Sequence, residues 1–198
     1  MQTTKEENDM GRVVVTEFVS LDGVMEDPGG AEDFAHGGWV FKFDRGHEGD
    51  QVKLDELANS EAQLLGRVTY EAFAKAWPER EGEFADFMNG MPKYVVSSTL
   101  SDPTWNNTTV LSGDVADAVG QLKERVEGDI LVAGSNTLVH ALLANDLVDE
   151  LRLMVFPVVL GSGKRLFPEG KEMAAFHLAE SNAVGDGVLT LVYWPKAL

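Results

Sequence analysis

Short runs of β-branched and aliphatic residues recur along the chain, and helical patterns separate most of them. The first run, residues 13–19, is too short for a buried helix and ends before an Asp22-Gly23 turn. The alternation of strand and helix up to Leu160 predicts parallel βαβ units, and so an α/β fold with a mostly parallel central sheet. Further strands of this part are expected at residues 62–65, 94–96, 108–111 and 130–133.

The C-terminal part departs from this alternation. Residues 176–184 and 188–194 flank Gly185-Asp186-Gly187, whose Asp-Gly pair is typical of a hairpin turn. We therefore expect an antiparallel C-terminal hairpin and, in total, about eight strands and at least four helices. The helical patterns start at Gln51 and cover 70–77, 84–88, 114–126 and 137–143.

Residues 24–50 are rich in Gly and Asp and are predicted to form a long loop. Loops of that length in a compact domain usually have a function. Trp39 and Phe41 would either cover a site as a lid or anchor the loop. Its five apolar anchors are Phe34, Trp39, Val40, Phe41 and Phe43.

Length and composition limit the remaining choices. The 198 residues suit one domain over residues 12–198, preceded by a polar, flexible segment over 1–11. A formal net charge of −17 argues against nucleic acid and against an anionic membrane surface as partners. The absence of Cys excludes disulfides and thiolate metal sites, and the lack of a signal peptide makes the cytoplasm the expected location.

Three junctions between a strand and the next segment carry glycine or hydroxyl residues. In parallel α/β sheets, ligands bind beyond the carboxyl ends of the strands, so these junctions are the candidate site. Glycine lets the backbone approach a ligand, helix N–H groups favour an anion, and a guanidinium binds phosphate. Each junction alone could be an ordinary turn. The three segments are Gly66-Arg67-Val68-Thr69, Ser97-Ser98-Thr99 and Gly134-Ser135-Asn136-Thr137.

Other chemistries have little support. Residues 161–165 resemble a phosphate loop, but Val158 stands where its first glycine belongs and Arg165 where a hydroxyl should hold magnesium. No GxSxG nucleophile elbow is present. We expect no metal site, because the histidines at 36, 47, 140 and 177 lack short ligand spacing.

In this order the motifs resemble those of the dihydrofolate reductase superfamily, and within it the reductase domain of the bifunctional riboflavin-biosynthesis deaminase-reductase and its stand-alone relatives. The resemblance runs from about Arg12 to Trp194. It is carried by Ser20-Leu21-Asp22-Gly23, Leu65-Gly66-Arg67-Val68-Thr69-Tyr70-Glu71, Lys93-Tyr94-Val95-Val96-Ser97-Ser98, Ile130-Leu131-Val132-Ala133-Gly134-Ser135, Glu150-Leu151-Arg152-Leu153 and Pro157-Val158-Val159-Leu160-Gly161.

The resemblance implies a three-layer α/β/α fold of the dihydrofolate reductase type and NADPH as cofactor. By this comparison Gly66, Arg67 and Thr69 would bind phosphates, and Ser97 and Ser98 the adenosine side with its 2′-phosphate. The pyrophosphate and nicotinamide half would lie on the third segment, Gly134, Ser135, Asn136 and Thr137.

The implied reaction is hydride transfer to a carbonyl or imine carbon of a small heterocyclic or ribosylamine substrate, as in 5-amino-6-(5-phosphoribosylamino)uracil reductases. The alternatives are dihydrofolate reduction and an NADPH-binding module without catalysis. Asp22 and Asp50 are the candidate catalytic residues, Asp50 by its spacing before the Gly-Arg-x-Thr motif; Asp22 could equally form a turn before Gly23. Relatives commonly form homodimers, and residues 151–160 with the hairpin could pair subunits or simply be core strands.

Overall fold

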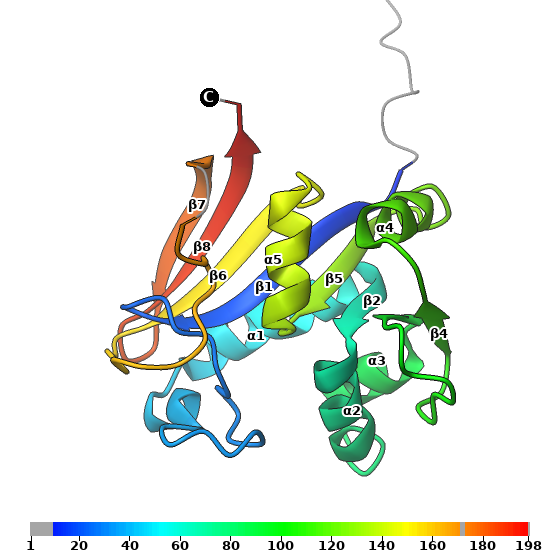
Figure 1. Ribbon diagram of the computed structural model, residues 1–198. Coiled ribbons are helices and arrows are strands. Elements are labelled where there is room, and N and C mark those ends of the chain that lie inside the picture. The colour runs from blue at the N-terminus through cyan, green and yellow to red at the C-terminus, as the bar shows by residue number, and fades with distance from the viewer. Residues whose placement is uncertain (1–9, 171–172, 198) are drawn as a thin grey trace, which may run out of the picture.

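The computed structural model describes residues 10–170 and 173–197, and these contain one eight-stranded sheet with helices on both faces (Figure 1). The strands are β1 (Arg12–Ser20), β2 (Ser60–Gly66), β3 (Lys93–Val96), β4 (Thr108–Leu111), β5 (Asp129–Ala133), β6 (Glu150–Phe156), β7 (Ala175–Val184) and β8 (Val188–Lys196). The helices are a 3-10 turn η1 (Trp39–Lys42), α1 (Gly46–Ala58), α2 (Arg67–Ala76), α3 (Glu83–Gly90), α4 (Val115–Lys123) and α5 (Asn136–Ala144).

The sheet confirms the predicted architecture. Its strand order is β4-β3-β2-β5-β1-β6-β8-β7. The first six strands in this order pair in parallel, whereas β8 runs antiparallel to both β6 and β7. The C-terminal hairpin therefore extends the sheet beyond β6, as its turn sequence indicates.

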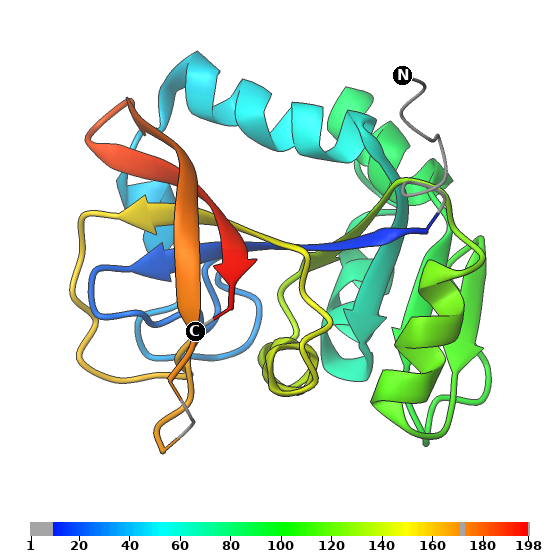
Figure 2. The same cartoon turned by 90° about the horizontal axis from the view of Figure 1, so that it is seen from above.

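Helices form a layer on each face of the sheet (Figure 2). Because strand side chains alternate between faces, neighbouring residues of β1 belong to different cores. Val13 and Val15 pack with α4 and α5, whereas Val14 packs with α1, α2 and α3. A third core lies around Trp39 and Phe156 near the hairpin. The central strand is thus buried on both sides, which explains its apolar sequence.

The strand register brings the carboxyl ends of β2, β3 and β5 to nearly one level. Gly66 at the end of β2 pairs with Val96 of β3, and Ala133 at the end of β5 pairs with Thr16 of β1. Beyond Thr16, β1 continues beside β6 alone. An opening therefore forms in the sheet where β5 turns away from β1, and the three predicted junctions lie around it.

The predicted loop over residues 24–50 is too long, because α1 begins at Gly46 rather than near Gln51. The first turn, Gly46-His47-Glu48-Gly49, has no large apolar side chain, so hydrophobic periodicity could not reveal it. A tertiary contact holds it instead. Gly49 is buried, and a Cβ there would lie 3.3 Å from the Val184 side chain.

The segment 24–45 is ordered by two of its own side chains. Asp27, with a positive φ of 45°, accepts backbone hydrogen bonds from Ala31 and Phe34. Trp39 is fully buried, and its indole N–H donates to the Glu26 carbonyl at 2.9 Å. Its ring meets that of Phe156 edge-on at 5.4 Å. Of the two roles considered for Trp39, the structure supports that of an anchor, whereas Phe41 is exposed.

The predicted N-terminal segment 1–11 falls almost entirely outside the described residues. From residue 12 onward the strands form one continuous sheet. No helix in the described part of the chain is long and apolar enough to cross a membrane.

Replacing Trp39 with Ala should lower the free energy of unfolding by about 3–5 kcal/mol, because it removes a fully buried aromatic side chain and leaves a cavity beside Phe156. Urea denaturation followed by circular dichroism measures this. Phe41→Ala is the matched control and should change stability by less than about 0.5 kcal/mol, since that ring lies in solvent. Equal losses in the two variants would contradict the anchoring role of Trp39.

Candidate functional site

The loops after β2 and β5 touch one another at the opening of the sheet. The backbone N–H of Gly66 donates to the hydroxyl of Ser135 at 2.8 Å. A Cβ on Gly66 would lie 3.2 Å from the Ser135 side chain, and one on Gly134 would lie 3.2 Å from Thr69 Cγ2. The structure therefore brings together four predicted cofactor-binding residues, Gly66, Thr69, Gly134 and Ser135, and a side chain at either glycine would crowd the opposite loop.

The two helices that start from these loops have no side-chain caps. Neither Gly66 before α2 nor Ser135 before α5 makes a side-chain cap hydrogen bond, whereas Asp114 caps α4 through the N–H groups of Ala116 and Asp117. Ser135 also has a left-handed backbone with φ of 70°, which is uncommon for a residue with a side chain and is typical of functional sites. The first turns of α2 and α5 can therefore bind an anion at their N–H groups.

Arg67 is the first residue of α2, and its guanidinium is half-exposed. It donates to both carboxylate oxygens of Glu71, at 2.9 and 3.0 Å. Because exposed ion pairs of this kind contribute little stability, the guanidinium can exchange Glu71 for a stronger anionic partner at small cost.

The second junction, Ser97-Ser98-Thr99, lies beside the first. Ser97 follows Val96, which pairs with Gly66. The Ser97 hydroxyl accepts hydrogen bonds from the N–H groups of Thr99 and Leu100, so it stabilises a turn, and Ser98 is exposed. Ser97 and Ser98 thus border the site one strand away from the contact between the two glycine loops.

The remaining two residues of the third motif point to different surroundings. Thr137 is exposed in the first turn of α5. The Asn136 amide donates to the Arg165 carbonyl at 2.7 Å and contacts Met25 Sδ at 3.4 Å. The Asn136 side chain therefore connects α5 to the segment after β6, and only its backbone belongs to the helix N-terminus.

Asp22, one of the two candidate catalytic residues, is bound by its own surroundings. Its carboxylate accepts hydrogen bonds from the Ser20 hydroxyl at 2.7 Å and from the N–H groups of Leu160 and Gly161 at 3.1 and 2.9 Å. The Ser20 hydroxyl, and after it the two backbone N–H groups, lower the pKa of Asp22 to about 2. A carboxylate held in this way connects the ends of β1 and β6 and is unsuited to releasing a proton near neutral pH.

Asp50, the other candidate, lies on the exposed side of α1. Two-thirds of its side chain is accessible, and its carboxylate pairs with Arg45 at 2.6 Å. The side chains of α1 that face β1 are instead Lys53 and Glu56. The sequence spacing therefore identified the helix, but the helix directs other residues inward.

A buried polar cluster that the sequence analysis missed lies at the opening of the sheet. The Thr16 hydroxyl donates to Glu56 at 2.8 Å and accepts from the Lys53 ammonium, which also pairs with Glu56 at 2.6 Å. Glu17, the next residue of β1, is 5% exposed and, because strand side chains alternate, lies on the opposite face of the strand from Thr16. The detectable signal was a glutamate inside an otherwise apolar central strand, because a carboxylate is rarely buried without a function or a partner.

Burial governs the ionisation of Glu17. Burial raises the pKa of this carboxyl group to about 8. The Lys53 ammonium and the backbone N–H of Gly134 favour the charged form and act against this rise, whereas the Glu56 carboxylate adds to it. Glu17 Oε1 has no hydrogen-bond partner among the described residues. The site thus contains a carboxylic acid that is largely uncharged at neutral pH.

Three cations that could have helped to bind phosphate are engaged elsewhere. Lys93 is fully buried and donates to the carbonyls of Asn89, Met91 and Asn106, and burial lowers its pKa to about 8. The other two, Lys164 and Arg165, bind Glu26 and the Asp22 carbonyl, respectively.

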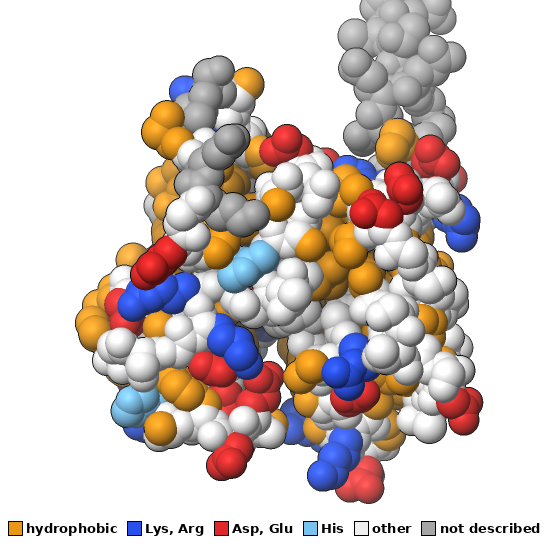
Figure 3. All heavy atoms as spheres, viewed as in Figure 1, with side chains coloured by type: hydrophobic (Ala, Val, Ile, Leu, Met, Phe, Trp, Pro, Cys, Tyr) orange, Lys and Arg blue, Asp and Glu red, His pale blue; other side chains and the backbone are white. Residues whose placement is uncertain are grey.

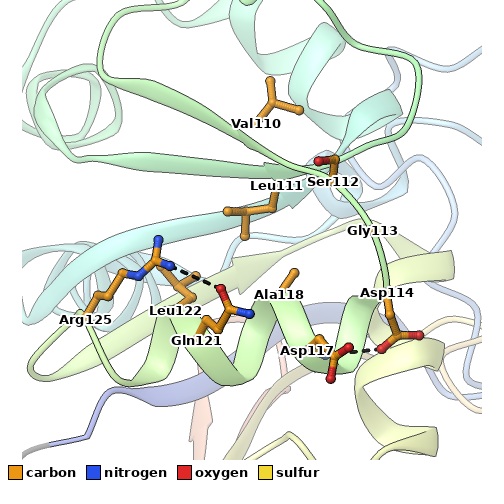
Figure 4. Close-up of a pocket in the computed structure, with 10 residues that line it drawn as sticks. All are labelled: Val110, Leu111, Ser112, Gly113, Asp114, Asp117, Ala118, Gln121, Leu122 and Arg125. Atoms are coloured by element: carbon orange, nitrogen blue, oxygen red, sulfur yellow. Dashed lines mark hydrogen bonds between the residues drawn. The ribbon is translucent and has the colours of Figure 1, made fainter.

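The surface is hollowed between the segment 24–45 and α2 (Figure 3). Asp and Glu side chains gather on the side formed by the segment 24–45. A separate shallow pocket of about 320 Å³ lies between β4 and α4, and its lining, which includes Asp117, Gln121 and Arg125, shares no residue with the candidate site (Figure 4).

A comparison with known protein families decides the assignment. The RibD C-terminal domain family matches residues 12–190. This chain belongs to that family. Membership supports an oxidoreductase of the riboflavin-pathway reductase type and confirms the resemblance that the sequence motifs indicate.

Individual relatives agree with the fold. YyaP of Bacillus subtilis (strain 168), an uncharacterized protein, is 27% identical over 187 residues, which cover 92% of this chain and 94% of YyaP. A protein from Shewanella sp. PV-4 that is named for riboflavin biosynthesis superposes with a TM-score of 0.75 at 21% identity, over 94% of this chain and 99% of that one. Dihydrofolate reductase from Enterococcus faecalis, solved with NADP(H), gives a TM-score of 0.57 at 15% identity, over 96% and 99% of the two chains. The predicted dihydrofolate reductase-like fold is confirmed.

Asp22→Asn should destabilise the protein by about 1–3 kcal/mol at neutral pH, because it weakens three hydrogen bonds to a charged acceptor. The folded-state pKa lies below the ordinary value of 3.8, so the stabilisation is complete above that value and disappears as the pH falls toward about 2. The difference between wild type and variant should therefore shrink in acid. Urea denaturation across this range measures it.

Asp50→Asn is the control, expected to shift stability by less than about 0.5 kcal/mol. A stability difference between wild type and Asp22→Asn that is constant at every pH would contradict the assignment.

Proposed function

We propose that this protein is an NADPH-dependent reductase of the riboflavin-biosynthesis reductase type. It would transfer hydride from the cofactor to a carbonyl or imine carbon of a small heterocyclic or ribosylamine substrate. When bound, the nicotinamide supplies the hydride, and the protein holds the donor and acceptor carbons near contact distance and away from water.

The contact between the two glycine loops is the observation that carries this proposal. Two helix N-termini without side-chain caps start from loops that touch through Gly66 and Ser135. Each offers several backbone N–H groups, and the hydroxyls of Thr69 and Ser135 lie beside them. Donors arranged in this way favour a pyrophosphate, and the glycines leave room for its close approach.

Charge makes the position of Arg67 important. A chain with a net charge of −17 repels a polyanionic cofactor over the distance at which it first approaches. Local donors must overcome that field, and at the mouth of the site Arg67 provides a cation whose partner, Glu71, is exposed. If Arg67 reaches the 2′-phosphate, it also favours NADPH over NADH.

Arg67→Ala should weaken NADPH binding roughly tenfold to a hundredfold, the loss expected for one charge-assisted hydrogen bond. Glu71→Gln should instead tighten it about threefold, because Arg67 then loses a competing anion. Fluorescence titration with NADPH and NADH measures both effects. Added salt should weaken binding to wild type and have less effect on Arg67→Ala.

Glu180→Gln on the exposed part of β7 provides the matched control, since it makes the same charge change as Glu71→Gln far from α2. Its dissociation constant should equal that of wild type. An unchanged constant in Arg67→Ala would remove Arg67 from the site, and tighter NADPH binding at higher salt would indicate that global repulsion dominates.

Oxidation of NADPH in the presence of pyrimidine ribosylamines and of dihydrofolate tests the reaction itself. Turnover with the ribosylamine class supports the proposal. Methotrexate-sensitive turnover of dihydrofolate would instead make the protein a folate reductase, and NADPH binding without any turnover would make it a binding module.

A further inference from the structure

Glu17 occupies the floor of the opening between β1 and β5. Its neighbour Thr16 pairs with Ala133, the last residue of β5, so the register continues from Glu17 toward Gly134. Gly134 in turn lies against Thr69, and Ser135 binds Gly66. Glu17 therefore lies where the two glycine loops converge, although it belongs to neither of them.

One oxygen of the Glu17 carboxyl group lacks a hydrogen-bond partner at this position. Oε1 is shut off from solvent and has no hydrogen-bond partner among the described residues, 10–170 and 173–197. A buried polar atom without a partner costs free energy, so a protein that keeps one at a ligand site commonly satisfies it with the ligand. The same carboxyl group lies beside the backbone N–H of Gly134, so the oxygen without a partner belongs to a group at the start of the loop before α5.

The charges near Glu17 argue against an anionic ligand group, such as a phosphate, beside this residue. Lys53 and Glu56, which face β1 from α1, influence it with opposite signs, and they pair with each other at 2.6 Å. This leaves no free cation in the described part of the floor to neutralise an added anion. Phosphate groups therefore belong at the helix N-termini, and the uncharged end of a dinucleotide belongs beside Glu17.

We propose that the carboxyl group of Glu17 binds the carboxamide of the nicotinamide ring through paired hydrogen bonds. This inference rests on the proposed function. A carboxylic acid offers one O–H donor and one carbonyl acceptor, and a primary carboxamide offers the complementary acceptor and donor. The pairing satisfies Oε1, fixes the orientation of the ring about its glycosidic bond, and thereby selects the face from which hydride leaves.

The pairing needs the protonated acid, so NADPH binding should depend on pH. Affinity for wild type should fall roughly tenfold between about pH 7 and about pH 9, because the folded-state pKa is about 8 and only the protonated form binds. Glu17→Gln keeps a donor and an acceptor in the same shape without titrating. Its affinity should match that of wild type at the lower pH and stay level at the higher one.

Two further variants separate the hydrogen bonds from shape. Glu17→Leu should bind NADPH about tenfold or more weakly at neutral pH, because both hydrogen bonds are lost. With the reduced 3-acetylpyridine analogue of NADPH, whose amide nitrogen is replaced by a methyl group, wild type should bind about threefold to tenfold more weakly than with NADPH. Glu17→Leu should not distinguish the two ligands.

Folding is checked in parallel by urea denaturation. Glu17→Gln should be more stable than wild type at neutral pH, and the advantage should decrease toward the ordinary glutamate pKa of 4.5. The raised pKa makes the folded state lose stability as the pH rises from 4.5 toward 8, and Gln removes this loss. Glu180→Gln is the control for both binding and stability.

The outcomes distinguish this inference from the proposed function. If wild type binds no NADPH at any pH, both are overturned. If wild type binds NADPH but Glu17→Gln shows the same decline with pH, or Glu17→Leu still distinguishes the analogue, only the role of Glu17 is overturned. A decline in wild type that is absent from Glu17→Gln, together with loss of discrimination in Glu17→Leu, supports it.

Discussion

The hydrogen bond from the Gly66 N–H to the Ser135 hydroxyl connects two loops that lie 69 positions apart in the chain. It can form only because β2 and β5 are neighbours in a parallel sheet and end at the same level. Any side chain on Gly66 would press against Ser135. The convergence of α2 and α5, the position of Arg67 and the position of Glu17 beside Gly134 all depend on this close approach.

The distribution of charge follows from the same architecture. Carboxylates outnumber cations about two to one in the sequence, yet each acid nearest the opening is either stabilised by donors, paired with a cation or kept uncharged. Hydrogen-bond donors keep Asp22 charged, Lys53 pairs with Glu56, and burial keeps Glu17 protonated. The opening in the sheet therefore carries less negative charge than the net charge suggests, which is compatible with the proposed anionic cofactor.

Sequence patterns predicted the sheet and its junctions because these depend on local rules. Gly66 and Gly134 were recognisable as the residues that follow apolar runs. The start of α1 was missed, since a tertiary contact at Gly49 rather than periodicity stabilises its first turn. Asp50 was selected by spacing, but spacing cannot tell which side of a helix faces the sheet when the helix is weakly amphipathic.

The sequence by itself determined the fold class and the segments that border the site, because strand and helix patterns depend on residues that are consecutive in the chain. Only the tertiary structure decided which side chains meet there. Glu17 became notable once the register set it level with Gly134, and Asp22 took a structural role once Leu160 and Gly161 were seen to bind it. Contacts between residues more than a hundred positions apart depend on strand order, and no local pattern records that order.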